Sequence, residues 1–318
     1  MNCLCCGKPL NTAAALNQWH KKCIKAFFNT AKFPDIDISE EVLNQLAIDS
    51  INKGFTVPGV QKKLSLHLTE EDTPRLTLVN YPTGYILKPQ TEEYKALPEL
   101  EYLVMRMAQA SGIKTVPFAL LRMGSHSSPY AYITRRIDRI FGENPGILAM
   151  EDFCQLDGRL TEDKYRGSYE RCGKIITKHS IQPGLDLSEL YLRVVFFFAV
   201  GNSDMHLKNF SLIETAPGSG EYVLSAAYDM LSTNIVLPAD QEQFALAMNG
   251  KKQNIRRNDF LHFADTIGIS RKSAEKLIDQ IVKREEIYIE MCRASYMPTD
   301  MKEAMETLIR ERLDILRK

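Results

Sequence analysis

The sequence predicts an α+β protein of two lobes, a small β-rich lobe followed by a larger helical one. Three observations predict this fold class. Several short segments between residues 64 and 136 alternate apolar and polar side chains, as half-buried strands do. One helical segment interrupts them, and helical spacing dominates from residue 138 onward. With 318 residues, the chain is long enough for two lobes that each have a core.

The composition is that of an ordinary globular protein. Hydrophobic residues make up 44% of the chain and charged residues 25%, and 40 Lys plus Arg balance 40 Asp plus Glu. This balance creates no overall field that would draw the protein to nucleic acid or to an anionic membrane. The longest apolar run, Val194–Val200, is too short to span a bilayer, so no membrane partner is expected.

The cysteine content predicts a reducing compartment. Seven cysteines, an odd number scattered through a large chain, argue against a framework of disulfides. The N-terminus "MNCLCCGKPL" also lacks the apolar core of a signal peptide. The cytoplasm is therefore the expected location.

The first segment of the chain is predicted to hold zinc. Cys3-x-x-Cys6 and His20-x-x-Cys23 offer four soft ligands, and a two-residue gap lets both members of a pair reach one ion. Cys5 competes with Cys6 for the same role. The alternative is a polar tail whose thiols bind nothing. If zinc binds here, a structural site is expected.

The small lobe is predicted as an antiparallel sheet with one inserted helix. The helix covers residues 98–111, with Pro98 in its first turn and Gly112 at its end. An isolated barrel fits poorly, because this helix lies between strands. A short helix over 39–51 is expected to precede the sheet. Strands are expected at 64–68, 75–79, 85–88, 116–123 and 130–136.

The larger lobe is predicted to centre on one buried helix. The segment "YLRVVFFFAV", which ends at Val200, is apolar on nearly every side, and Gly201 can form the left-handed turn that ends the helix. A hairpin of strands 210–213 and 222–225 flanks the turn sequence "TAPGSG". The predicted domains are therefore the zinc segment at 1–30, the small lobe at 31–137 and the helical lobe at 138–318.

A dense polar cluster follows the buried helix directly. The loop presents Asp204, Lys208 and Asn209, and a second acid, Asp229, follows the hairpin. An Asp, an Asn five residues later and an Asp beyond a hairpin form a constellation that is used for phosphoryl transfer. Asp204 would orient the acceptor hydroxyl and take its proton. Asn209 and Asp229 would bind magnesium, and Lys208 would lie beside the transferring phosphate. The spacing alone arises by chance in many loops; the helix and hairpin around it favour the catalytic interpretation.

Phosphoryl transfer from ATP also needs a lysine held by an acid in the small lobe. Lys88 ends the strand "YILK", and Glu101 lies on the following helix, so the two are predicted to pair. The simpler alternative for Glu101 is a solvated helix charge. The chain has no G-x-G-x-x-G motif. In its place, Gly59 would let backbone approach phosphate, and Lys63 would neutralise it.

Taken in order, these motifs resemble the HipA-like kinases, toxins of bacterial toxin–antitoxin modules. The resemblance runs from about Thr56 to the C-terminus, through "TVPGVQKKLSL", "YILKP", "ITRRIDR", "EDFCQ", "GNSDMHLKNFSL", "AAYDML" and "FALAMNGK". It implies a two-lobed protein-kinase-like fold, which phosphatidylinositol kinases share. It also implies that Asp204 is the catalytic base and that Asn209 and Asp229 bind magnesium.

The resemblance further implies which residues bind ATP. The phosphate loop covers the phosphates, Lys88 pairs with them, and the backbone of residues 135–137 holds the adenine. Thr56 matches the position at which such kinases phosphorylate themselves, while Pro58 stands where a second serine is usual. The expected ATP-binding residues are Pro58, Gly59, Val60, Gln61, Lys62, Lys63, Lys88, Arg135, Arg136, Ile137, His206, Lys208, Asn209, Tyr228 and Asp229.

The function implied is serine/threonine protein phosphorylation with ATP and magnesium. Its expected target is a translation component such as an aminoacyl-tRNA synthetase. Expected partners are a helix-turn-helix antitoxin and, only through it, operator DNA. Full-length HipA proteins carry an N-terminal β-rich subdomain for which the chain before Thr56 has no room. The sequence is therefore closer to the short HipT-type toxins, whose missing subdomain a separate small protein provides.

Two other classes of function compete with a toxin kinase. One is a small-molecule or lipid kinase, because a histidine, His206, follows the predicted catalytic acid. The other is an interaction module that binds zinc or nucleotide without catalysis. The presence of Lys88, Asp204, Asn209 and Asp229 together argues against the second class, since a pseudokinase does not need all four.

Overall fold

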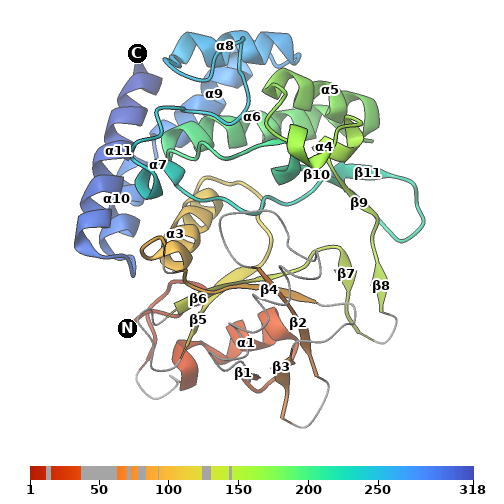
Figure 1. Ribbon diagram of the computed structural model, residues 1–318, viewed down its shortest axis with the longest axis vertical. Coiled ribbons are helices and arrows are strands. Elements are labelled where there is room, and N and C mark those ends of the chain that lie inside the picture. Colours follow the sequence, from red (N-terminus) through yellow and green to blue (C-terminus); the bar gives the residue numbers. More distant parts are fainter. Residues whose placement is uncertain are drawn as a thin grey trace. The chain divides into compact units, whose positions relative to one another are not determined.

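The computed structural model describes residues 1–11, 16–36, 63–69, 73–77, 84–91, 93–123, 130–142 and 145–318 (Figure 1). The chain divides into two units. Unit 1 comprises Met1–Tyr102 and Val116–Ile137, and unit 2 comprises Leu103–Thr115 and Asp138–Lys318. The predicted small lobe of 31–137 differs from unit 1 in two respects: residues 1–30 belong with it, and residues 103–115 belong to the other unit.

Unit 1 contains a six-stranded sheet in the order β1-β3-β2-β4-β6-β5. Neighbouring strands are antiparallel, except that β1 runs parallel to β3. The five strands expected between residues 64 and 136 are present, whereas β1 was not anticipated. The helix expected at 39–51 lies outside the described residues. The strands are β1 (Asp35–Ile36), β2 (Leu64–Leu68), β3 (Arg75–Thr77), β4 (Tyr85–Lys88), β5 (Phe118–Arg122) and β6 (Tyr130–Arg135).

The predicted alternation of side chains fits β2, where Leu64 and Leu66 are buried and Ser65 is exposed. The N-terminal segment covers the edge strand β5, because Leu120 donates its backbone N–H to the carbonyl of Leu4. η2 (Leu16–Gln18) and α1 (Lys21–Phe28) follow this segment, and Figure 1 shows α1 against the sheet. The predicted helix at 98–111 is α3 (Leu97–Ala110), which begins in unit 1 and ends in unit 2.

Unit 2 is mainly helical, as predicted, with a three-stranded sheet in the order β11-β10-β9 and a separate pair, β7 and β8. β10 and β11 form the predicted hairpin, whereas β7, β8 and β9 were not anticipated. The elements are β7 (Arg139–Ile140), β8 (Gly146–Ile147), β9 (Met150–Asp152), α4 (Phe153–Leu156), η3 (Thr161–Asp163), α5 (Tyr169–His179), α6 (Pro183–Ala199), η4 (Leu207–Asn209), β10 (Ser211–Glu214), β11 (Tyr222–Leu224), α7 (Thr233–Val236), α8 (Arg257–Thr266), α9 (Arg271–Val282), α10 (Glu285–Arg293) and α11 (Thr299–Arg317).

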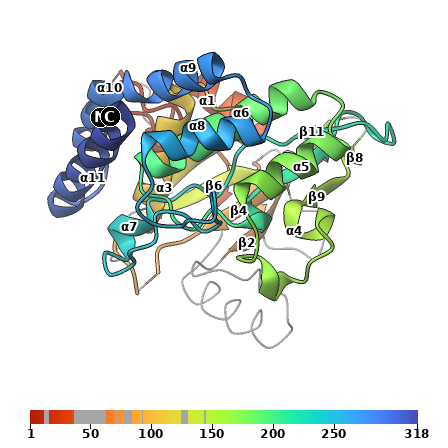
Figure 2. The same ribbon diagram turned by 90° about the horizontal axis from the view of Figure 1, so that it is seen from above.

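Helix α6 forms the centre of unit 2. Every side chain from Leu190 to Val200 is buried, which accounts for the nearly continuous apolar run in the sequence. Figures 1 and 2 show α6 between α5 and α9, and both helices pack against it. Because α6 is fixed on several sides, the residues that follow it start from a rigid point. Within the described residues, no helix has both the length and the apolar character needed to cross a membrane.

Candidate active site

The loop that carries Asp204 starts from a left-handed turn at the end of α6. Gly201 adopts a φ of 65°, and the N–H groups of Gly201 and Asn202 bond back to carbonyls in the last turn of the helix, at 3.3 and 2.9 Å. These two bonds form a Schellman motif, which confirms the predicted helix end. A Cβ on Gly201 would lie 2.5 Å from Cδ2 of Leu308, so a larger residue would have to displace the Leu308 side chain and would be strained at this positive φ.

Asp204 is held in the loop mainly through its backbone. Its carbonyl oxygen accepts hydrogen bonds from the backbone N–H of His206 and from Nδ2 of Asn209, both at 2.9 Å. Its own N–H donates to Oδ1 of Asn202 at 3.3 Å. The carboxylate accepts a 2.6 Å hydrogen bond from the hydroxyl of Tyr165. The loop therefore keeps its shape through groups other than the Asp204 carboxylate.

Two acidic groups act on a buried histidine in this loop. His206 is 6% exposed, and its ring meets that of Tyr165 edge-on, with centroids 4.9 Å apart. Burial lowers the pKa of His206 to about 4, against the opposing effect of the Asp204 and Asp229 carboxylates. Its Nδ1 atom has no hydrogen-bond partner among the described residues. His206 is thus neutral at pH 7 and lies within electrostatic reach of both acids.

Hydrogen bonds tie the segment before Asp229 to the segment around Asn209. The hydroxyl of Tyr228 lies 2.6 Å from Oγ of Ser211 and donates to the carbonyl of Lys208 at 3.2 Å. Tyr228 therefore binds one residue on the N-terminal side of Asn209 and another beyond it. An amide and a carboxylate, which offer the hard oxygen ligands that magnesium prefers, are thereby brought to one region of unit 2.

Asp229 itself adopts a left-handed backbone conformation, with a φ of 57°. Such a conformation is uncommon for residues other than glycine, although Asp tolerates it better than most. The chain leading to Asp229 is fixed from α6, because the buried Arg193 guanidinium donates to the carbonyl of Ser225 at 2.8 Å. Unusual backbone conformations that the surrounding structure holds in place cluster at functional sites. Asp229 has such a conformation, and a hydrogen bond fixes the chain that leads to it.

Lys208 makes a contact that the sequence did not indicate. Its Nζ lies 2.7 Å from Oδ2 of Asp152, and this aspartate also caps α4 by accepting the N–H of Gln155. The predicted position of Lys208 beside a transferring phosphate stays a prediction. In that position, the Lys208 ammonium group would bind phosphate in addition to Asp152 or in its place. Tyr165 was missed, and Asp152 was given no role although it stands in the motif "EDFCQ", because each lies far along the chain from the residue it contacts.

In unit 1, Lys88 and Glu101 form the predicted pair. Nζ of Lys88, at the end of β4, lies 2.5 Å from Oε1 of Glu101 on α3, and the two side chains are 6% and 1% exposed. The ammonium group also lies 5.3 Å from the ring centre of Tyr132, the residue opposite on β6. Glu101 is therefore a buried partner of the lysine and not a solvated helix charge.

The predicted adenine-binding backbone lies at the end of β6. The N–H of Arg135 donates to the carbonyl of Pro117 at 2.9 Å, and the N–H of Arg136 donates to that of Gly84 at 2.8 Å. Two of the three backbone donors are thus used within unit 1. Adenine could accept a hydrogen bond from either of these N–H groups only if its present bond within unit 1 were broken.

The predicted phosphate loop cannot be placed. Thr56 and residues 58–62 lie outside the described residues, and only Lys63 at its end is described, directly before β2. The loop's part in binding ATP and the modification of Thr56 therefore stay predictions.

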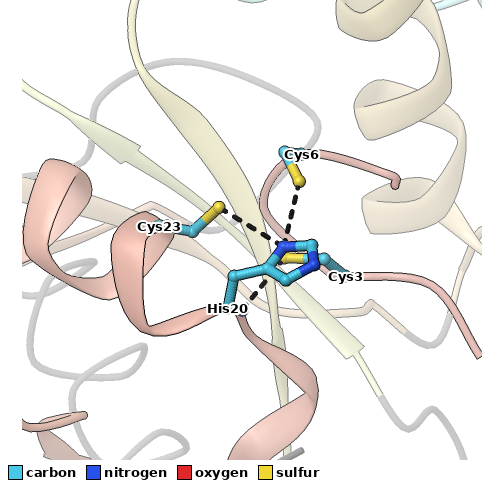
Figure 3. A group of neighbouring side chains, drawn as sticks. All are labelled: Cys3, Cys6, His20 and Cys23. Carbon is cyan, nitrogen blue, oxygen red and sulfur yellow. Dashed lines mark hydrogen bonds between the residues drawn. The ribbon is translucent and has the colours of Figure 1, made fainter. Parts of the chain in front are cut away.

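The four predicted zinc ligands do come together in unit 1. One ligand atom from each of Cys3, Cys6, His20 and Cys23 lies within 4.8 Å of the others, and Figure 3 shows the three sulfur atoms around one imidazole. Sγ of Cys6 and Sγ of Cys23 lie 3.3 and 3.7 Å from Nδ1 of His20. Cys5 is not part of the group, which resolves the ambiguity between Cys5 and Cys6.

Comparison with known proteins places the chain among kinase relatives. The family model of the HipA-like C-terminal domain matches residues 55–287. A candidate kinase from Haemophilus influenzae is 27% identical over 97% of this chain and 95% of its own length. The candidate kinase Y4dM from Sinorhizobium fredii is 29% identical over 72% of this chain but only 58% of its own length.

Two solved structures share the fold. One is the toxin HipA of Shewanella oneidensis, in complex with HipB and its operator DNA, with a TM-score of 0.68 and 19% identity over 85% of this chain and 70% of that one. The other is the proinflammatory kinase CtkA of Helicobacter pylori, with a TM-score of 0.53 and 19% identity over 76% of this chain and 92% of that one. The predicted two-lobed, kinase-like fold is thereby confirmed.

Proposed function

Because the chain belongs to the HipA-like C-terminal domain family, we propose that it is an ATP-dependent serine/threonine protein kinase and the toxin of a bacterial toxin–antitoxin module. The observation that carries the proposal is the buried ion pair of Lys88 and Glu101. A lysine held in this way by a helical acid is how kinases present a cation to ATP phosphates. Taking both charges out of water has a cost, which suggests a role beyond stability.

The chemistry follows from the residues of unit 2. Asp204, oriented by Tyr165, accepts the proton of the acceptor hydroxyl as that oxygen bonds to the γ-phosphorus, and ADP leaves. Oδ1 of Asn209 and the carboxylate of Asp229 are suited to hold Mg²⁺, which would neutralise phosphate charge. Nδ2 of Asn209 is already bonded within the loop, so its oxygen is the atom that remains for a metal. His206 adds no positive charge at neutral pH.

The proposal includes partners of defined kinds. The toxin HipA of Shewanella oneidensis was solved with the antitoxin HipB and operator DNA, which supports a helix-turn-helix antitoxin as a partner here. DNA is then contacted only through that antitoxin, which agrees with the net charge of zero. We further propose that a small protein that resembles the N-terminal subdomain of HipA is a second partner. The proposed location is the cytoplasm, and the proposed substrate is an aminoacyl-tRNA synthetase.

The principal alternative is a lipid or small-molecule kinase. A histidine two residues after the catalytic acid, His206, is the observation that favours it. Assays of purified protein with labelled ATP, with mixed protein acceptors in one arm and phosphoinositide vesicles in the other, separate the two. Transfer to protein alone supports a protein kinase; transfer to lipid alone overturns it. Nucleotide binding without transfer to either acceptor would support the pseudokinase interpretation.

The substrate is best sought in cells. The phosphoproteome of cells that express Asp204→Asn should lack a few serine or threonine sites that are present with the wild type and with Asp265→Asn. Asp265 is an exposed acid on α8, and its replacement controls for the loss of one negative charge. Sites that appear with wild type and Asp265→Asn but not with Asp204→Asn identify the substrate. The absence of any such site would contradict a protein kinase.

We expect the protein to phosphorylate itself at Thr56. This residue lies three positions before Gly59 of the predicted phosphate loop, so its hydroxyl would come near the γ-phosphate of ATP. A phosphate there would add roughly two negative charges beside the nucleotide and weaken its binding. Peptide mass spectrometry after incubation with ATP should find phosphate at Thr56 in the wild type and none in Asp204→Asn. An active wild type whose Thr56 stays unmodified would contradict this prediction.

A further inference from the structure

The residues Cys3, Cys6, His20 and Cys23, here called the Cys/His cluster, have the dimensions of a tetrahedral metal site. Around one Zn²⁺, two sulfur ligands lie about 3.8 Å apart, and a sulfur and a nitrogen ligand about 3.6 Å apart. The sulfur–nitrogen distances of 3.3 and 3.7 Å at His20 bracket that value. All four ligand atoms lie within 4.8 Å of one another, so a contraction of about 1 Å at most would bring them to these distances.

The backbone around the cluster is shaped to present these ligands. Cys3 and Cys6 lie on a tight turn, in which the N–H of Gly7 bonds to the carbonyl of Cys3 at 2.8 Å and Gly7 adopts a φ of 67°. His20 is the N-cap of α1, and Cys23 stands in its first turn, three residues later. Cys3 and Cys6 therefore come from a turn, and His20 and Cys23 come from the start of a helix. Figure 3 shows that these four side chains converge.

A further contact fixes the state of the histidine. Nε2 of His20 lies 3.0 Å from the carbonyl oxygen of Pro9. Because a carbonyl oxygen can only accept a hydrogen bond, Nε2 carries the proton, and the lone pair of Nδ1 points to the sulfur atoms. An outer hydrogen bond of this kind is what orients the histidine ligands of metals. In addition, the N–H of His20 lies 3.4 Å from Sγ of Cys3.

The cluster joins two parts of the chain that support the sheet of unit 1. The segment with Cys3 covers the edge of β5, where the indole N–H of Trp19 also donates to the carbonyl of Leu120 at 3.2 Å. Helix α1 contacts the centre of the sheet, since the carbonyl of Phe27 accepts from the hydroxyl of Tyr85 at 3.2 Å. Tyr85 begins β4, the strand that ends at Lys88. None of the seven cysteines forms a disulfide that would join these parts.

We propose that the Cys/His cluster binds one structural Zn²⁺, which holds the N-terminal segment and α1 against strands β4, β5 and β6. Three thiolates and one imidazole fill all four positions of a tetrahedral ion, so no position is left for water or substrate. The metal therefore stabilises unit 1 and takes no part in the chemistry. This inference is independent of the proposed kinase activity, because it concerns only the fold of unit 1.

The test uses the full-length protein purified without chelator. Elemental analysis should find about one zinc per chain in the wild type and in Cys5→Ser, and much less in Cys6→Ser and Cys23→Ser. Cys5→Ser is the matched control, because it changes the neighbouring thiol outside the cluster. Equal loss of zinc in Cys5→Ser would overturn the assignment of ligands. A wild type that contains no zinc and takes up none when zinc is added would overturn the site itself.

A second measurement uses only the wild type and so does not depend on whether the variants fold. Wild-type protein stripped of metal and titrated with Co²⁺ should develop the absorption bands of tetrahedral cobalt with thiolate charge transfer, saturating at one ion per chain. Addition of Zn²⁺ should then abolish these bands. Octahedral spectra without thiolate bands, or a disulfide between two cluster cysteines in place of bound metal, would contradict the proposal.

Discussion

The two units hold their predicted catalytic residues in different ways. In unit 1, Lys88 projects from a strand and is held by one buried acid, Glu101. In unit 2, Asp204 lies on a loop whose shape depends on hydrogen bonds to its backbone, made by Asn209 and His206. This difference indicates that the positive charge of Lys88 contributes to the stability of the folded unit 1. The carboxylate of Asp204, in contrast, can be replaced while the loop keeps its shape.

The largest effect on stability is expected from breaking the pair in unit 1. Lys88→Met leaves the buried Glu101 carboxylate without its lysine, and this should lower the free energy of unfolding by roughly 3–5 kcal/mol. Lys208→Met breaks the more exposed pair with Asp152 in unit 2 and should have a much smaller effect, about 1 kcal/mol or less. Urea denaturation measures both.

The double variant Lys88→Met/Glu101→Leu sharpens this comparison. Replacing a buried ion pair by apolar residues is often close to neutral, so the double variant should recover most of the lost stability while remaining inactive. Equal effects of Lys88→Met and Lys208→Met would show that the buried pair is no more important to the fold than the exposed one.

A second effect, on the order of 3 kcal/mol, is expected from pH. Burial raises the pKa of Glu99 on α3 to about 7, and its Oε2 atom has no hydrogen-bond partner among the described residues. The unfolded chain has the ordinary value of 4.5. The folded state therefore binds the proton more tightly, and this contribution to stability is present below pH 4.5 and lost as the pH rises through 7.

Glu99→Gln removes this titration and tests the sign. Between pH 4.5 and 7 the wild type should lose stability relative to the variant, as measured by urea denaturation at a series of pH values. Tyr130, the group whose pKa Glu99 itself helps to raise, stays neutral throughout this range and does not obscure the effect. Parallel pH profiles for the two proteins would contradict the prediction.

A third effect, smaller than those expected at Lys88 and Glu99, is expected at Asp229. Asp229→Asn keeps the size of the side chain but weakens its hold on magnesium, so ATP should bind roughly tenfold to a hundredfold less tightly, or ~1.4–2.7 kcal/mol. Isothermal titration with and without magnesium measures this. Asp265→Asn is the control and should bind as the wild type does. A loss of affinity that persists without magnesium would show that Asp229 is not a metal ligand.

Local patterns were enough to predict much of the fold and several contacts of the candidate site. Alternation and helical spacing place Lys88 at the end of a strand and Glu101 on the next helix, and the spacing of cysteines and histidine identifies the Cys/His cluster. Short spacings such as these depend on secondary structure alone. For the same reason, the order of apolar and polar residues predicted α6, the end of this helix at Gly201 and the hairpin that follows.

Other contacts depend on tertiary packing, which local patterns do not determine. Tyr165 donates to Asp204 from 39 residues away, and Lys208 meets Asp152 from 56 residues away. Both partners lie in segments with no periodicity that marks them. The parallel pairing of β1 with β3 and the covering of β5 by residue Leu4 were missed for the same reason. The residues of the phosphate loop other than Lys63 lie outside the described residues, so the prediction for this loop stays open.

The central claim is that Asp204 is the base of a phosphoryl transfer, and one measurement tests it most directly. Initial rates of transfer from γ-labelled ATP to protein are compared for the wild type, Asp204→Asn and Asp265→Asn, with ATP affinity and unfolding measured on the same samples. Asp204→Asn should fold and bind ATP with magnesium as the wild type does, yet transfer phosphate roughly 10²–10⁴-fold more slowly. Wild-type rates in a folded, ATP-binding Asp204→Asn would contradict the account.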